Sequence, residues 1–137
     1  MHRRTLLLLA LALSILVALT ACQDDKQPSS TPADVTEQFF AAFAASDYKA
    51  MEAYCTEECI TSYFHDDDVN GFVWAKLVTA GEAEPADDHS TSIFVTVEAE
   101  TAPSSSLQLS TEGKTSFYVH LIQNEDGQWL IDRFTTG

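Results

Sequence analysis

The apolar residues of this chain change their spacing at Asn70 and Gly71, and this change most limits what the chain can fold into. Before the pair, apolar residues recur every three or four positions, which is typical of helices with one buried face. After it, apolar and polar residues alternate, which is typical of strands buried on one side. Helices followed by antiparallel strands predict an α+β fold.

Three positions in the first half carry the signals of helix starts. Thr31 is a typical N-cap residue with Pro32 directly after it, and Asp47 and Thr56 are typical caps of a second and a third helix. The apolar face of the first helix is aromatic, so we expect it to form much of the core; it comprises Val35, Phe39, Phe40 and Phe43.

The second half of the chain predicts strands separated by polar loops. Residues 82–90 and 102–106 are typical of loops, and residues 107–110 fit a short strand or an edge. Strands are expected at residues 72–79, 92–100, 116–123 and 128–135, the last two as a hairpin.

Residues 35–43, 47–51 and 126–132 together resemble the NTF2-like superfamily. Its domains open with a long helix, continue with a second helix that starts with a small residue, Asp and an aromatic residue, and close on a Gly-x-Trp-x-Ile strand. The resemblance covers most of residues 32–137. It implies an NTF2-like (cystatin-like) cone, in which N-terminal helices pack on a curved antiparallel sheet of about four strands around a pocket.

The N-terminus has the layout of a secretory signal. Arg3 and Arg4 precede an apolar run at residues 6–19, and small residues precede Cys22. The run is short for a transmembrane helix, which needs about 20 apolar residues. The stretch therefore predicts export of the chain from the cytoplasm.

Leu19, Thr20, Ala21 and Cys22 resemble the lipobox of bacterial lipoproteins, some of which belong to domain families of unknown function. The resemblance implies a diacylglycerol on Cys22 and cleavage directly before it; an ordinary signal with an incidental cysteine is the alternative. We expect a signal peptide at residues 1–21, a lipidated tether at residues 22–31 and a folded domain at residues 32–137. The domain would then be held on the extracytoplasmic side of the cell membrane.

The charge of the chain excludes several classes of partner. Removal of residues 1–21 takes away two of the seven basic residues and none of the 21 acidic ones, so the formal net charge falls from −14 to −16. So acidic a surface repels nucleic acid and anionic lipid headgroups. The N-terminal lipid is therefore the expected contact with the membrane, and no nucleic-acid partner is expected.

Cys55 and Cys59 form an even pair once lipid modifies Cys22. At helical spacing their Cα atoms would lie about 6 Å apart, within the range of a disulfide but with strain. Both a disulfide and two buried free thiols fit the sequence. A redox centre is less favoured, because the chain has no Cys-x-x-Cys motif.

Asp66, Asp68 and Asn70 are spaced like the first three ligands of an EF-hand calcium loop, and Gly71 follows at the sixth position. The twelfth position, which should be a bidentate Glu, is Leu77. A solvated acidic turn explains the same residues. We therefore expect at most weak metal binding and no cofactor.

His120 and Asp132 are the acid–base candidates, because a histidine beside a carboxylate can move protons near neutral pH. A type I turn with a left-handed Gly127 would place Asn124 opposite Gln128 and His120 opposite Asp132. This register assigns the pair to the outward, mixed face, so we expect a surface pair without catalysis. The opposite face should meet the helices; it carries Phe117, Val119, Leu121, Trp129 and Ile131.

The resemblance and the anchor together favour a non-catalytic module that binds a small ligand or a protein. The superfamily also contains isomerases and dehydratases, so a pocket enzyme is one alternative. A dimerisation or assembly module, with a homodimer formed through the sheet, is another.

Replacement of the predicted lipidation site tests the anchor. We expect Cys22→Ser to abolish lipid attachment and to leave an uncleaved or mislocalised precursor, because the lipid would be attached to the sulfur atom of Cys22. Membrane fractionation with mass spectrometry of the N-terminus measures both effects. Wild-type protein found without lipid in the soluble extracytoplasmic fraction would overturn the predicted location.

Overall fold

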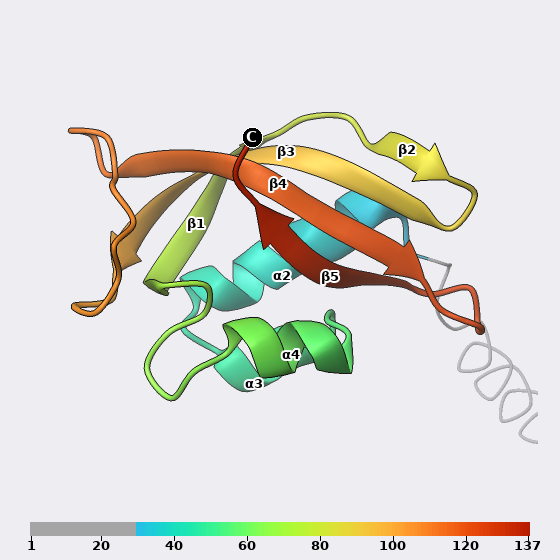
Figure 1. Cartoon of the computed structure of the whole chain (residues 1–137), viewed down its shortest axis with the longest axis horizontal. Coiled ribbons are helices and arrows are strands. Elements are labelled where there is room, and N and C mark those ends of the chain that lie inside the picture. Colours follow the sequence, from blue (N-terminus) through green and yellow to red (C-terminus); the bar gives the residue numbers. More distant parts are fainter. Residues whose placement is uncertain (1–29) are drawn as a thin grey trace, which may run out of the picture.

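The computed structural model describes residues 30–137 as three helices followed by five strands (Figure 1). The predictions for residues 1–29, including lipidation of Cys22, lie outside the described residues. In chain order the elements are α2 (Pro32–Ala44), α3 (Tyr48–Glu52), α4 (Glu57–Tyr63), β1 (Phe72–Ala80), β2 (Glu84–Asp87), β3 (Ser90–Thr101), β4 (Lys114–Gln123) and β5 (Trp129–Thr135).

The three helices begin at the capping residues that the sequence predicts. Thr31 and Asp34 form a capping box at α2: the Thr31 hydroxyl accepts from the Asp34 amide at 3.2 Å, and the Asp34 carboxylate accepts from the Thr31 amide at 3.1 Å. At α3 the Asp47 carboxylate accepts from the Ala50 amide, and at α4 the Thr56 hydroxyl accepts from the Cys59 amide, both at 3.1 Å. These side chains satisfy backbone amides that a helix start leaves without partners.

The sheet is antiparallel and is built on β3, which pairs with β4 along one edge and with both β1 and β2 along the other. β5 continues the sheet beyond β4. The edge made of β1 and β2 is irregular. β1 contains two register shifts, the hydroxyl of Tyr48 donates to the carbonyl of Val73, and β2 contains Pro85.

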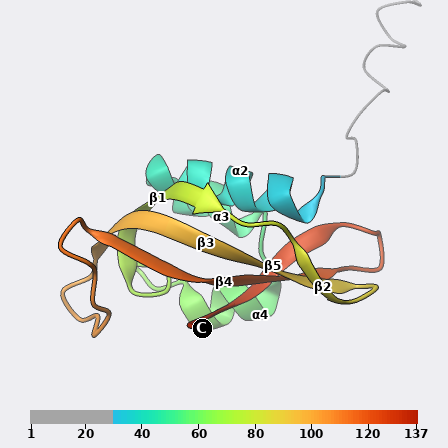
Figure 2. The ribbon, with the colours of Figure 1, turned by 90° about the horizontal axis from the view of Figure 1, so that it is seen from above.

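The core lies between the helices and one face of the sheet; α2 runs behind β4 and β5 in Figure 1 and along one side of the sheet in Figure 2, and α3 and α4 lie below β5 in Figure 1. Phe39, Phe40 and Phe43 of α2 are at most 2% exposed. The Phe40 ring lies 6.3 Å from that of Phe117 in β4, and the Phe39 ring lies 5.8 Å from that of Phe134 in β5. The sheet contributes to this core mainly Ile93, Val95, Val97, Val119, Leu121 and Ile131.

The outer edge of β5 pairs with the segment between α3 and α4. The Ile131 amide donates to the Tyr54 carbonyl at 2.8 Å, the Thr56 amide donates to the Ile131 carbonyl at 2.9 Å, and Cys55 forms a parallel bridge with Ile131. The Thr56 hydroxyl donates to the Asp132 carboxylate at 3.1 Å while it caps α4. This segment therefore fastens the short helices to the sheet.

The predicted NTF2-like cone with about four strands is wrong. The structure is mostly an antiparallel sheet of five strands, and its helices have 13, 5 and 7 residues. The missed strand, β2, lies inside the stretch predicted as a loop at residues 82–90, because all four of its side chains are exposed and Pro85 is typical of loops. Residues 107–110 form no strand.

No helix among residues 30–137 has both the length and the apolar composition needed to cross a membrane.

Thr56 tests how firmly α4 is held. We expect Thr56→Ala to lower the free energy of unfolding by about 1–2 kcal/mol, because it removes both the cap and the bond to Asp132. Thr56→Ser keeps the hydroxyl and should change the value by less than about 0.5 kcal/mol. Urea unfolding measures both. Equal losses in the two variants would show that the hydroxyl is not what stabilises this segment.

Candidate functional site

A half-open groove of about 700 Å³ lies at the end of the domain where α2 begins. Its walls come from the first turns of α2, the segment after α3 and the β4–β5 hairpin. The lining residues are Ser30, Val35, Gln38, Ala53, Tyr54, Asp126, Gly127, Gln128, Trp129 and Leu130.

The hairpin turn holds the polar rim of the groove. The Asn124 side-chain oxygen accepts from the amides of Asp126 at 3.0 Å and Gln128 at 2.9 Å, and the Asn124 amide donates to the Gln128 carbonyl at 2.9 Å. Gly127 has φ 80°, as the turn requires. This is the turn that the sequence predicts, and it places Asp126 and Gln128 at the groove.

Two aromatic side chains, Tyr54 and Trp129, line the groove from neighbouring segments. Both are half-buried. The hydrogen bond from the Ile131 amide to the Tyr54 carbonyl aligns the segment of Tyr54 with β5, where Trp129 is the first residue. Val35, 4% exposed, supports this wall from α2. The groove thus has an aromatic wall and a polar rim.

The titratable side chains of the lining are Asp126 and Tyr54. The lining contains no histidine, cysteine, lysine or arginine. The arrangement is suited to binding a molecule with apolar and polar parts.

His120 lies outside the groove, on the sheet face opposite the helices. Its Nδ1 is 3.0 Å from the Ser92 hydroxyl and its Nε2 is 2.6 Å from the Thr135 hydroxyl. Burial lowers the pKa of His120 below its ordinary value; nearby Arg133 lowers it further, and Asp132 acts in the opposite direction. The surroundings of the imidazole therefore favour its neutral form.

The predicted pairing of His120 with Asp132 is wrong. The expected register holds from Gln123 to Leu121, which faces Ile131, but a bulge follows and His120 faces Arg133. Asp132 is the extra residue of the bulge, and it bonds to Thr56 instead.

The same bulge changes which face of the sheet the last side chains of β5 point to. Phe134, which the regular register assigned to the outward face, is 8% exposed and packs against Tyr63 with ring centroids 5.1 Å apart. A large aromatic residue gains more from burial than from exposure, and the bulge is what lets it turn inward.

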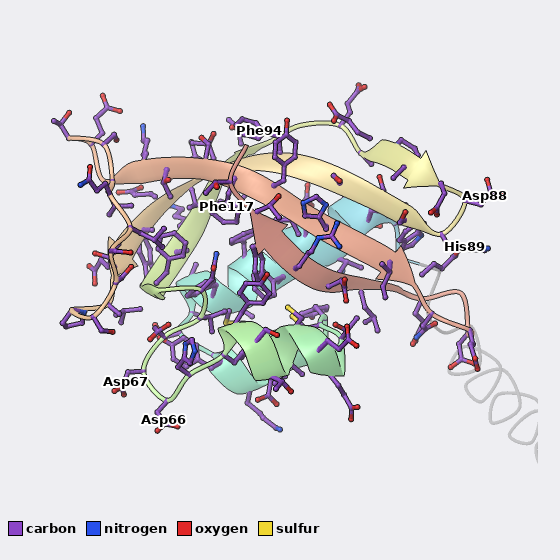
Figure 3. The ribbon with its side chains drawn as sticks, viewed as in Figure 1. Asp66, Asp67, Asp88, His89, Phe94 and Phe117 are labelled. Carbon is purple, nitrogen blue, oxygen red and sulfur yellow. The ribbon has the colours of Figure 1, made fainter. Side chains whose placement is uncertain are left out.

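In the acidic turn, the carboxylate of Asp68 stabilises the turn itself. Asp68 accepts from the Gly71 amide at 3.0 Å and lies 3.1 Å from His65, and Asn70 has φ 54°. Asp66 and Asp67 point away from the domain (Figure 3). Within residues 30–137 no group of three metal-binding side chains gathers here or elsewhere, so nothing adds to the weak metal prediction for Asp66, Asp68 and Asn70.

Cys55 and Cys59 are free and buried in the structure. A hydrogen bond with the Cys59 thiol and burial both raise the pKa of the Cys55 thiol, so it stays protonated. A disulfide between the two remains a prediction.

No protein-family model matches the chain, and no curated protein matches its sequence significantly. Its fold is similar to the solution structure of a SEC-C motif containing protein from Rhodopseudomonas palustris, with a TM-score of 0.52 and 11% sequence identity. The match covers 81% of this chain and 82% of the other. At this identity the likeness concerns the fold alone.

The resemblance to NTF2-like lipoproteins is therefore wrong as a family assignment, since the comparisons lead to a SEC-C motif protein and to no NTF2-like protein or lipoprotein. The stretches that suggested it are two capped helix starts and one hairpin. Caps and turns are local devices that recur in unrelated folds, which is why they misled.

The lowered pKa of His120 makes the free energy of unfolding depend on pH, and the direction of that shift sets the sign. As the pH falls below about 6.5, the unfolded chain takes up a proton that the folded chain does not, so the free energy of unfolding falls. We expect the wild type to lose more stability between pH 7.5 and 5.5 than His120→Gln does. Urea unfolding at both pH values measures the difference, and NMR titration of His120 should give a midpoint below 6.5. A midpoint above that value would contradict the prediction.

Proposed function

We propose that this chain is a membrane-tethered, extracytoplasmic module that binds a small ligand in its groove without catalysing a reaction. The groove itself carries the proposal. Its volume of about 700 Å³ lies in the range of roughly 300–1,000 Å³ that is common for small-molecule sites, and polar and apolar groups contribute to its lining in similar measure.

The position of the groove fits a tethered receptor. Ser30, at the start of the described residues, is part of the lining. If Cys22 carries lipid, the eight residues from Gln23 to Ser30 would span roughly 15 Å on average. The groove would then lie close to the membrane surface, where it could take up ligands that arrive there.

Binding is favoured over catalysis by the chemistry of the lining. A pocket enzyme of the isomerase or dehydratase type needs an acid or base beside the substrate. His120, the strongest acid–base candidate, is bonded to Ser92 and Thr135 and is not among the lining residues.

Self-association through the sheet is the second candidate. The sheet face opposite the helices exposes Phe94, 43% accessible, and Ile122, 37% accessible. Phe94 points away from the helices (Figure 3). Sedimentation of the domain over a range of concentrations distinguishes a dimer from a monomer.

Filling the groove tests the main proposal. A panel of small metabolites, screened by thermal unfolding, should contain compounds that raise the Tm of the wild type; at ten times the Kd, binding adds about 1.4 kcal/mol and roughly 5 °C. Ala53→Trp puts a large side chain in the groove and should remove these shifts.

Ala45→Trp is the matched control, because Ala45 is exposed at the end of α2 and is not among the lining residues. The Ala45→Trp variant should show every ligand-induced rise in Tm that the wild type shows. Shifts that persist in Ala53→Trp, or a panel without any shift, would contradict the proposal.

A further inference from the structure

The groove lining combines aromatic rings with a carboxylate and contains no cationic side chain. Tyr54 and Trp129 are half-buried in the wall, and Asp126 lies at the rim on a turn fixed by Asn124. Aromatic faces attract cations, most strongly where water is partly excluded, and a carboxylate adds a direct charge pair. These are the groups that recognise amines and quaternary ammonium compounds.

The basic side chains of residues 30–137 all lie elsewhere. Lys49 pairs with Glu52 at 2.8 Å on the surface of α3. Lys76 and Lys114 both lie beside Glu98, and Arg133 faces His120, on the sheet face opposite the helices. No side chain of the lining therefore carries a positive charge that would repel a cationic ligand or attract an anionic one.

The negative net charge of the whole chain also favours a cationic ligand. With 21 acidic and seven basic residues, the protein produces a negative potential that raises the local concentration of cations and speeds their association. An anion entering the groove would meet this potential and the Asp126 carboxylate without a compensating donor of positive charge.

We propose that the ligand of the groove is a small organic cation, an amine or quaternary ammonium compound with an apolar part. This inference rests on the proposed function, because it names the ligand class of the same groove. The apolar part packs on Val35 and Leu130, and the cationic group lies against Trp129 and Tyr54 near Asp126.

Pairs of cationic and neutral probes test the ligand class. Choline and 2-phenylethylamine are compared with their neutral counterparts, 3,3-dimethylbutan-1-ol and 2-phenylethanol. Trp129 reports binding by fluorescence in a Trp74→Phe background, which removes the other tryptophan; Trp74 bonds to the Ala44 carbonyl at 2.9 Å, away from the groove. Calorimetry with the unaltered chain checks that this substitution leaves affinity unchanged.

We expect at least one cationic probe to bind at least tenfold more tightly than its neutral counterpart, and to bind less tightly as salt is raised. Neutral probes that bind as tightly as the cations would overturn the ligand class and leave the proposed binding function intact. The same holds if the compounds that shift the Tm in the metabolite panel are neutral or anionic. If neither the four probes nor the panel bind, both the ligand class and the binding function fail.

Asp126 and its neighbour Glu125 provide a matched pair of variants. Both are exposed in the same turn, but only Asp126 lines the groove. We expect Asp126→Asn to weaken binding of the cationic probe about fivefold and Glu125→Gln to weaken it less than twofold. Equal losses would show a general attraction by the acidic surface and would overturn the assignment of Asp126.

Discussion

The pairing of the segment around Cys55 with β5 is the contact on which the rest of the structure depends. Two backbone hydrogen bonds of Ile131 hold this segment against the sheet edge. The contact satisfies the outward-facing groups of Ile131, positions Thr56 to cap α4, and sets Tyr54 alongside the strand that carries Trp129. Helix placement, protection of the sheet edge and the aromatic wall of the groove therefore all follow from one short stretch.

The helix caps and the hairpin turn of this fold can be predicted from the sequence, and strand β2 and the bulge in β5 cannot. The caps at Thr31, Asp47 and Thr56 and the turn at Asn124 depend on residues a few positions apart, and each forms as expected. Strand β2 pairs with residues 90–92 directly after it, but its exposed side chains and Pro85 give no strand signal. The bulge at Asp132 goes with a contact to Thr56, far away in the chain, so the sequence around it gives no clear signal. The family resemblance failed because it rested on helix caps and a hairpin turn, which recur in unrelated folds.

The groove could not be predicted from spacing, because its lining comes from three separated parts of the chain. Histidine and carboxylate patterns directed attention to His120 and Asp66 instead, and the structure separates both from the groove. Trp129 was assigned to the face that meets the helices, and it is half-buried there with one side in the groove. The one feature of the sequence that pointed to the groove was Trp129, an aromatic residue directly after a polar hairpin turn.

The irregular edge formed by β1 and β2 limits how copies of this domain can associate through their sheets. Proline at position 85 offers no amide, the two register shifts interrupt the ladder of β1, and Tyr48 occupies the carbonyl of Val73. An incoming strand would find no regular row of donors and acceptors to extend. Copies of the domain at high local concentration would thus stay separate folded domains rather than join edge to edge into fibrils.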